Sequence, residues 1–287
     1  MDVDTAPTVG IVGGQGGIGR LFGRLLAAAG APTLVSDRGT DLTNSDLAAR
    51  CDLVLVAVPL RATPAVLAEL APLVRPDAAL ASLGSLMELA LPSLERCTGH
   101  PFLLHPLFGP GRRSLRGATL AVAAPPHGTT APAYPVSARW QNWLFDLLRR
   151  QGAVIVATTP QEHDRAMAVA QALLHGVGIA LAPLVLDGLP GPDPLAWASP
   201  TLRLQLALMA RILRQDPRLY GDLLALNRHA PAAITALIGR LSVLLDAMTS
   251  GPGAADAVAD LFAAARDALG PLGPGLAAEG DRALGEG

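Results

Sequence analysis

Short apolar runs alternate with amphipathic segments through the first half of the chain. The run DLVLVAVP is almost uninterrupted, as in a strand buried on both faces of a parallel sheet. The pattern predicts strands at residues 8–12, 32–36, 52–59, 78–85, within 100–110, at 118–124 and at 152–158, and helices at 18–29, 62–74 and 137–151. Strands that alternate with helices predict an α/β fold with a doubly wound parallel sheet.

The pattern changes after Pro160, where long helical segments follow one another and strand signals stop. Helices are expected at residues 161–189, 198–215, 217–248 and 254–269. The Gly/Pro-rich tail, residues 270–287, is expected to fray. We therefore expect two domains, an α/β domain at residues 1–159 and an all-α domain at residues 160–287.

Composition narrows the class of protein. The chain has 287 residues, 51% of them apolar, and a net charge of −2, which fits a globular protein and gives no reason to expect nucleic acid or an anionic membrane as partner. All 22 basic residues are arginine, so chemistry that needs a lysine is excluded. Cys51 and Cys97 are too few for a disulfide framework or a zinc site. No metal is expected, and the N-terminus lacks the features of a signal peptide, so we expect a cytoplasmic protein.

One apolar stretch raises the question of a membrane. Residues 166–186 carry no Asp, Glu, Lys or Arg and are long enough to cross a bilayer. The stretch also contains Gln171, His175 and Pro183, and no aromatic residues mark its ends. A helix that is apolar on all sides is also typical of a protein core or a dimer core. We expect this buried setting, with no membrane as partner.

A glycine-rich turn follows the first predicted strand. It has the spacing G-x-G-x-x-G and consists of Gly14, Gln15, Gly16, Gly17, Ile18 and Gly19. Between a strand and a helix, this spacing is typical of Rossmann dinucleotide-binding domains. Gly14 is expected to allow the tight turn, Gly16 the close approach of the pyrophosphate, and Gly19 the packing of helix on strand. The alternative is a glycine-rich turn that binds nothing.

The next two strands end in further candidates for the cofactor site. Asp37 ends the second strand, where a carboxylate can accept hydrogen bonds from the adenosine ribose hydroxyls and so favours NAD. Arg38 beside it could instead hold the 2′-phosphate of NADP, which keeps that alternative open. Val58 and Pro59 end the third strand and are assigned to the same site.

Ser85 and His105 follow later strands, and both are expected at the carboxyl edge of the sheet, where open α/β sheets bind ligands. A histidine there can take a proton from a substrate hydroxyl as hydride leaves. The alternative for His105 is a hydrogen-bonded structural histidine. His163 is expected in a helix N-terminal turn, with Glu162 and Asp164 complementing the helix dipole. Arg203 could clamp a substrate carboxylate or remain a solvated surface charge.

Several strings along residues 8–240 resemble one family. GGQGGIGRLFGRLL, DLVLVAVP, LHPLFGP, EHDRAMAVAQALLH and SPTLRLQLALMARILRQDPRLYGDLL are similar to segments of bacterial prephenate dehydrogenases. The resemblance implies an N-terminal nucleotide-binding domain, a helical C-terminal dimerisation domain and a homodimer. It also implies the oxidative decarboxylation of a dicarboxylate substrate. In that reaction, hydride leaves the ring carbon that bears the hydroxyl, the ring carboxylate departs as CO₂, and the ring becomes aromatic.

The resemblance also implies roles for individual residues. His105 matches the catalytic histidine that binds the substrate hydroxyl, and Ser85 matches a serine that orients it. Ser114 and His175 match positions that line the family's active site.

The chain departs from the family pattern at two places. Leu86 and Met87 stand where the family usually has a lysine after its serine. Where the family has an arginine that pairs with a substrate carboxylate, this chain has His229, with Arg228 just before it. Either Arg228 takes over the contact or the contact has changed. The altered position is compatible with prephenate or with 4-amino-4-deoxyprephenate, in which an amine replaces the hydroxyl.

Two other functions compete with this one. The first is a β-hydroxy-acid or imine oxidoreductase, since such enzymes also join a Rossmann domain to a helical dimerisation domain. They generally rely on a lysine or aspartate of the helical domain as acid, and lysine is absent here. The second is a non-catalytic NAD-binding regulatory protein, which would tolerate the loss of His105.

Overall fold

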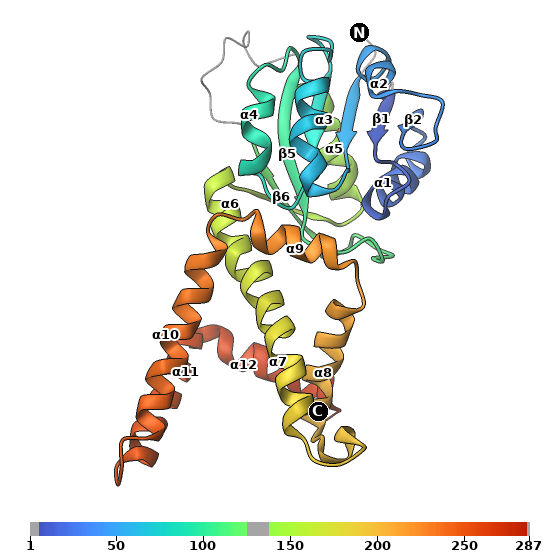
Figure 1. Cartoon of the computed structure of the whole chain (residues 1–287). Coiled ribbons are helices and arrows are strands. Elements are labelled where there is room, and N and C mark those ends of the chain that lie inside the picture. Colours follow the sequence, from blue (N-terminus) through green and yellow to red (C-terminus); the bar gives the residue numbers. More distant parts are fainter. Residues whose placement is uncertain (1–5, 125–137, 286–287) are drawn as a thin grey trace. The chain divides into compact units, whose positions relative to one another are not determined.

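A computed structural model describes residues 6–124 and 138–285 (Figure 1). Residue 137, the first of the helix predicted at residues 137–151, lies outside these residues. The chain forms two compact units. The first, called here the nucleotide unit, runs to Met167 and includes Ala225–Asn227; the second, called here the helical unit, contains Ala168–Leu224 and Arg228–Gly287. The nucleotide unit therefore includes residues 160–167 and Ala225–Asn227, which lie beyond the expected boundary at residue 159, and that boundary stays a prediction.

The nucleotide unit is built on one seven-stranded sheet with the strand order β2-β1-β3-β4-β5-β6-β7. Its elements are β1 (Val9–Val12), α1 (Gly17–Ala28), β2 (Thr33–Ser36), α2 (Asn44–Arg50), β3 (Leu53–Val56), the 3-10 turn η1 (Leu60–Ala62), α3 (Thr63–Leu70), β4 (Ala79–Ser82), the 3-10 turn η2 (Glu88–Ala90), α4 (Leu91–Leu94), β5 (His100–Pro106), β6 (Thr119–Ala123), α5 (Ala138–Arg150), β7 (Val154–Ala157) and α6 (Pro160–Met167). Every predicted strand is present.

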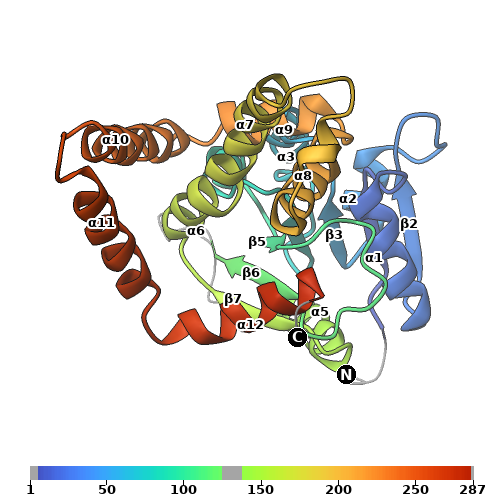
Figure 2. The same cartoon turned by 90° about the horizontal axis from the view of Figure 1, so that it is seen from below.

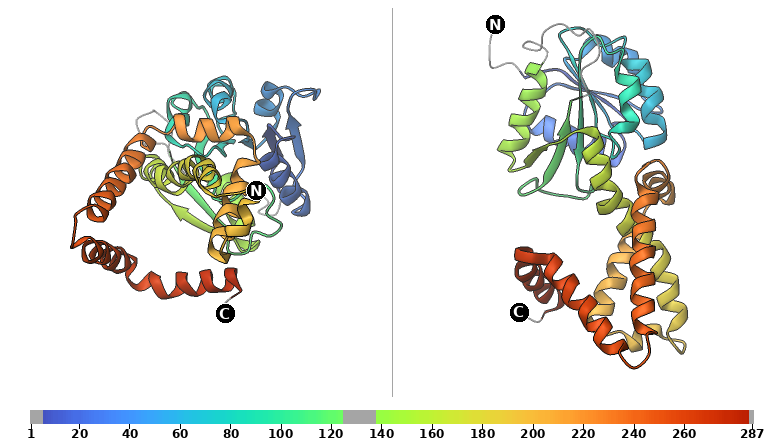
Figure 3. Two further views of the ribbon diagram at one scale, coloured as in Figure 1. Left: turned by 60° about the horizontal axis from the view of Figure 1, so that its bottom comes forward. Right: turned by 90° about the vertical axis from the view of Figure 1, so that its left-hand side faces the viewer.

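Helices cover both faces of the sheet, as the doubly wound prediction required (Figure 3). Phe22 and Leu26 of α1 and Leu148 of α5 join one buried cluster with the strands. Leu47 of α2 and Leu67 of α3 join a second cluster on the opposite face. Alternate residues of the central strands enter different clusters, which explains their near-continuous apolar sequence.

The sheet is mostly parallel, and one strand pair departs from that direction. β6 pairs with β5 in the antiparallel direction, with His105 opposite Ala121, while β7 is parallel to β6 (Figure 2). A Gly/Pro-rich loop joins β5 to β6 and returns the chain without a crossover helix. Antiparallel neighbours can be connected in this way, whereas parallel ones need a crossover.

The helical unit contains the π-helical turn η3 (Ala168–Leu173), α7 (Leu174–Gly188), the 3-10 turn η4 (Pro194–Trp197), α8 (Pro200–Leu213), α9 (Pro217–Ala225), α10 (Ala230–Met248), α11 (Ala254–Leu269), the 3-10 turn η5 (Gly270–Leu272) and α12 (Gly273–Leu284), although the last residue of α9 groups with the nucleotide unit. No strand occurs among described residues 160–285. The single helix predicted over 217–248 is broken, and Pro231 lies in the first turn of α10, where a missing N–H is tolerated. The tail predicted to fray instead forms α12.

Apolar side chains of the helical unit are largely exposed in the single chain. Two helical stretches, Pro160–Gly188 and Ala230–Met248, are long and apolar enough to cross a membrane by length and composition alone. Only 17% of the first window and none of the second is buried. The first stretch is therefore not a core helix of the single chain, contrary to one of the two settings that we expected.

Candidate active site

The carboxyl ends of four parallel strands define the candidate site. β1, β3, β4 and β5 are parallel neighbours, with Val12, Val56, Ser82 and Leu103 at the same level of the sheet. The glycine turn follows β1, and Ser85 follows β4. His105 lies two residues beyond Leu103 in β5. These groups therefore come from the same edge of one sheet, which is where ligands bind in open α/β folds.

The glycine turn is packed too tightly for side chains. Gly13, just before the predicted motif, has a φ of +80° and is the left-handed residue of the turn. A Cβ on Gly14 would lie 2.5 Å from Val35 Cγ1, so Gly14 is required for contact with β2. A Cβ on Gly19 would collide with the Gly13 carbonyl oxygen, so the first turn of α1 packs closely on the glycine turn itself. Gly16 precedes the first turn of α1, whose N-terminus favours an anion.

Asp37 lies beside this turn and is fixed to it. The backbone N–H of Gln15 donates to Asp37 Oδ2 at 2.8 Å, and the N–H of Arg38 donates to Oδ1 at 2.7 Å. Val58 Cγ1 would stand 3.1 Å from a Cβ on Gly13, and the exposed Pro59 follows it. The structure thus brings the predicted cofactor residues of three strands together.

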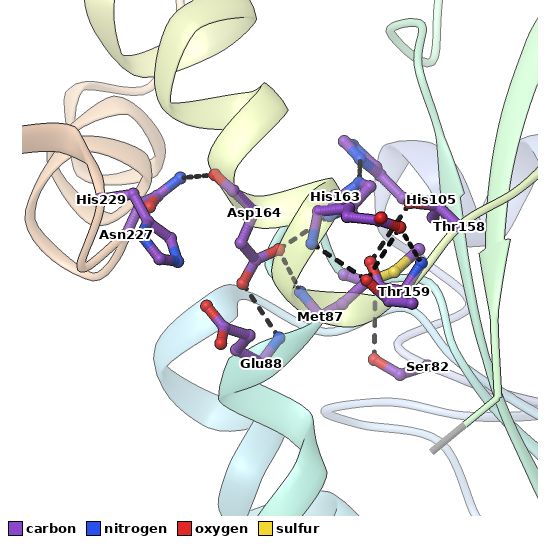
Figure 4. Close-up of polar contacts among 12 residues, drawn as sticks. Ser82, Met87, Glu88, His105, Thr158, Thr159, His163, Asp164, Asn227 and His229 are labelled. Atoms are coloured by element: carbon purple, nitrogen blue, oxygen red, sulfur yellow. Dashed lines mark hydrogen bonds and ion pairs between the residues drawn. The ribbon is translucent and has the colours of Figure 1, made fainter. Parts of the chain in front are cut away.

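His105 is buried, with 3% of its surface exposed, and it contacts a second histidine that is equally buried (Figure 4). His105 Nδ1 lies 2.9 Å from His163 Nε2, and the two rings meet edge to face. His163 Nδ1 lies 2.7 Å from Asp164 Oδ1. Burial, and repulsion from His163 when that ring is charged, lower the pKa of His105 to about 3. His105 is therefore neutral near pH 7, with one ring nitrogen unprotonated.

The Asp164 carboxylate also holds the segment that follows Ser85. The N–H of Met87 donates to Oδ1 and the N–H of Glu88 donates to Oδ2, each at 2.9 Å. The carboxylate therefore binds the start of η2, and not the start of its own helix as predicted. Ser85 itself is half-buried.

A capping box places His163 and Asp164. Thr159 Oγ1 accepts from the N–H of Glu162 at 3.2 Å, and Glu162 Oε2 accepts from the N–H of Thr159 at 3.1 Å. Pro160 fills the first helical position, where it is favoured. The side-chain amide of Asn227 donates to the backbone carbonyl of Asp164 at 2.8 Å. The sequence signal T-x-x-E could predict this helix start, but not the contact of His163 with a residue 58 positions away.

The remaining predicted residues fall in two places. Ser114 lies in the loop after β5, where its Oγ accepts from the N–H of Arg116 at 3.2 Å. The others belong to the helical unit. There the His175 and Tyr220 rings meet edge to face, with their centroids 4.8 Å apart. Arg203 donates to the Leu195 carbonyl oxygen at 3.0 Å. Arg228 Nε lies 3.4 Å from His229 Nε2.

Leu86 and Met87, which stand where the family usually has a lysine, are buried. Leu86 and Met87 are each 1% exposed, and Met87 packs in the core cluster beneath α3 and α4. The donors to the Asp164 carboxylate are therefore the N–H groups of Met87 and Glu88 and the His163 ring, and no lysine is among them.

Comparisons with known proteins relate the chain to one family. Residues 28–124 match the family model described as prephenate dehydrogenase, nucleotide-binding domain, and residues 159–246 match prephenate dehydrogenase, dimerization domain. The chain is 30% identical over 296 residues to the 4-amino-4-deoxyprephenate dehydrogenase of Streptomyces pristinaespiralis, covering 93% of this chain and 92% of that protein.

Two further relatives differ in length and in the kind of likeness. The probable arogenate/prephenate dehydrogenase of Methanocaldococcus jannaschii is 29% identical over 243 residues, 78% of this chain; the chain spans 53% of that protein's length. The crystal structure of A. aeolicus prephenate dehydrogenase with hydroxyphenyl propionate and NAD+ has a TM-score of 0.72 at 18% identity, with 92% of this chain and 98% of that chain covered. The last likeness shows the fold. From the two family models and the relative matched over nearly its whole length, the chain belongs to the prephenate dehydrogenase family.

Proposed function

We propose that this protein is an NAD-dependent dehydrogenase that oxidatively decarboxylates prephenate or 4-amino-4-deoxyprephenate to the corresponding 4-substituted phenylpyruvate. The observation that carries the proposal is the buried, neutral His105, held by His163 at the same sheet edge as the glycine turn. Family membership supports it, and the A. aeolicus relative was crystallised with NAD+ and hydroxyphenyl propionate.

The residues at the glycine turn fit a dinucleotide. A side chain at Gly16 would fill space beside the Gly13 carbonyl oxygen, at 3.2 Å, which leaves the backbone bare for a pyrophosphate. The Asp37 carboxylate is fixed beside the turn, where it can accept from ribose hydroxyls and repel a 2′-phosphate. We therefore propose NAD over NADP, with Arg38 as the residue that could reduce this preference.

The chain's own residues supply the acid–base chemistry. When bound, NAD supplies the acceptor for the hydride that leaves the ring carbon. His105 accepts a proton from the hydroxyl of prephenate, or from the amine that replaces it in the amino compound, and so favours departure of the hydride. Ser85 is proposed to orient that hydroxyl. As the ring carboxylate leaves as CO₂, its electron pair makes the ring aromatic and the proton returns to the ring oxygen.

The substrate could be the hydroxyl or the amino compound, and one observation favours the amino compound. The Streptomyces relative is matched over 92% of its length, whereas the relative named arogenate/prephenate dehydrogenase is matched over 53%. The pairing of Arg228 with His229, in place of a lone arginine, is consistent with a changed carboxylate contact. Ser114, His175 and Arg203 are proposed as further substrate contacts.

The test offers both substrates to the purified protein with NAD and with NADP, and follows cofactor reduction and the phenylpyruvate product. Turnover of either substrate supports the proposal, and the preferred one identifies the substrate. His105→Ala should lower kcat by about 10²–10⁴-fold. The proposal is wrong if protein shown to bind NAD turns over neither compound. That result would favour a β-hydroxy-acid or imine oxidoreductase or a non-catalytic NAD-binding protein.

We further propose a cytoplasmic homodimer in which a second copy covers the exposed helices. In the single chain, none of the residues of α8, α11 and α12 is buried. Large apolar side chains are exposed along this unit: Phe262 of α11 by 71%, Leu272 of η5 by 68% and Met248 of α10 by 60%. Burying such side chains is favourable by roughly 1.5–3 kcal/mol each. The matched dimerization model covers residues 159–246. Sedimentation that finds a stable monomer at micromolar concentration would contradict this.

A further inference from the structure

We infer that His163 and Asp164 are positioning residues that hold His105 in its base-competent tautomer and receive the proton that His105 takes from the substrate. The inference rests on the proposed function and extends it from one histidine to an Asp–His–His chain within the nucleotide unit (Figure 4).

The first step concerns the direction of the hydrogen bonds. Both oxygens of Asp164 accept backbone N–H groups, from Met87 at Oδ1 and Glu88 at Oδ2, so the group is held as a carboxylate acceptor. His163 Nδ1, 2.7 Å from Oδ1, must therefore carry a hydrogen and donate it. Three donors fix the carboxylate, and the carboxylate in turn fixes the His163 ring.

The second step concerns His105. With a hydrogen on Nδ1, a neutral His163 has Nε2 free as an acceptor, and the atom that faces it is His105 Nδ1 at 2.9 Å. His105 then carries its hydrogen on Nδ1 and leaves Nε2 unprotonated. That tautomer can accept a proton from a substrate hydroxyl, and the opposite tautomer cannot.

The third step concerns where the proton goes. Burial lowers the pKa of His105 to about 3, so a positive charge on this ring is strongly disfavoured. His163 is as buried, but its ring lies against a carboxylate that can balance the charge. The substrate O–H bond breaks as His105 Nε2–H forms, and His105 Nδ1–H breaks as His163 Nε2–H forms.

The transfers then reverse. When CO₂ leaves and the ring becomes aromatic, the proton returns through the same two rings to the ring oxygen, and both histidines regain their starting tautomers. Because the reaction of a hydroxyl substrate releases no net proton, the pair has to hold one only between hydride loss and CO₂ loss.

The decisive variant is His163→Gln. A glutamine oxygen can still accept from His105 Nδ1 and preserve the tautomer, but it cannot carry the proton. We expect kcat to fall by about 10²-fold with KM unchanged. His100→Gln is the matched control, because His100 is as buried as His163. It lies in β5, against Gln141. That variant should keep the wild-type kcat. His163→Gln with a wild-type kcat, in protein of unchanged thermal stability, overturns the inference.

A measurement without turnover separates this inference from the proposed function. Nitrogen-15 NMR of histidine-labelled wild-type protein should show His105 and His163 each protonated on Nδ1 near neutral pH. Protonation of His105 on Nε2 instead would overturn the inference even in an active enzyme. Protein that turns over neither substrate would sink the proposed function, and the spectrum would still decide the tautomer.

Discussion

Pro110 packs directly on Gly17, where the loop after His105 meets the start of α1. A Cβ on Gly17 would stand 2.8 Å from both Cβ and Cγ of the Pro110 ring. The loop that follows the proposed base and the turn proposed to bind the pyrophosphate therefore share one contact within the nucleotide unit. A substitution at Pro110 should therefore shift the glycine turn, and a substitution at Gly17 should shift the loop after His105.

Gly17→Ala should weaken NAD binding, because its methyl group must displace Pro110. Overpacking of this kind costs about 1–3 kcal/mol, and a cost of that size borne by the bound state lowers the affinity for NAD by about 5- to 150-fold. Gly23→Ala is the control on the same helix, since its Cβ would lie 3.8 Å from Ile11 Cδ1. It should bind NAD normally and unfold at the same or a higher temperature. Titration with NAD checks both, and equal affinities would contradict the prediction.

Asp37→Asn should reduce the preference for NAD over NADP. The change removes the negative charge that opposes a 2′-phosphate and places an amide where Gln15 and Arg38 donate their N–H groups. We expect NAD affinity to fall about tenfold, as for the loss of a charge-assisted hydrogen bond. NADP affinity should rise or stay constant. Asp41→Asn, an exposed acid in the same loop, is the control and should alter neither affinity.

Thr159→Ala should lower both stability and kcat, because Thr159 caps the helix that presents His163. Thr43→Ala removes an equivalent capping box from α2, where Thr43 pairs with Asp46. Each change should cost about 1 kcal/mol of unfolding free energy. Only the first should reduce kcat, as measured alongside denaturant unfolding. Equal kcat values for the two variants would show that the cap does not position His163.

Acid should destabilise the wild-type chain more than it destabilises His105→Asn. The pKa of His105 is about 3 in the folded chain and near the ordinary 6.5 in the unfolded chain. Between these pH values the unfolded state binds the extra proton, so the free energy of unfolding falls as the pH falls through 6.5 towards 3. The slope is at most about 1.4 kcal/mol per pH unit. Denaturant unfolding across this range should show a shallower slope for the variant, and parallel slopes would refute the assignment.

Leu241→Arg should dissociate the proposed dimer. Leu241 lies on α10 and is 54% exposed in the single chain, as is Leu73 of the nucleotide unit at 47%. Replacing an exposed surface residue normally changes stability by less than about 0.5 kcal/mol. Leu73→Arg should follow that rule, whereas Leu241→Arg should shift sedimentation towards monomer. Unchanged sedimentation of the α10 variant would place the dimer contact elsewhere.

Elements that bury a long apolar face could be predicted from the sequence, and those that depend on distant partners could not. The seven strands and the turn at Gly14–Gly19 are visible because period and glycine spacing are local properties. The short helices α2 and α4 are too brief to show a period. The direction of β6 follows from how the chain returns after β5, which no periodicity encodes.

The candidate site divides in the same way. His105 could be proposed from its place after a strand, since the carboxyl edge of a sheet collects ligands. His163 and Asp164 were predicted only as members of a helix turn, because their partners lie 58 to 77 residues away. No local sequence pattern shows that the first turn of α6 places His163 against His105.

Asp164 joins segments that are distant along the chain, and this bears on folding. Its carboxylate accepts from Met87 and Glu88, 77 and 76 residues before it, and its backbone carbonyl accepts from Asn227, 63 residues after it. Contacts of such long sequence separation close large loops, which slows their formation relative to helices and local turns. The arrangement around His105 is therefore expected to be among the last parts of the nucleotide unit to assemble. A chain that has regained most of its helix and sheet during refolding would still lack a competent base.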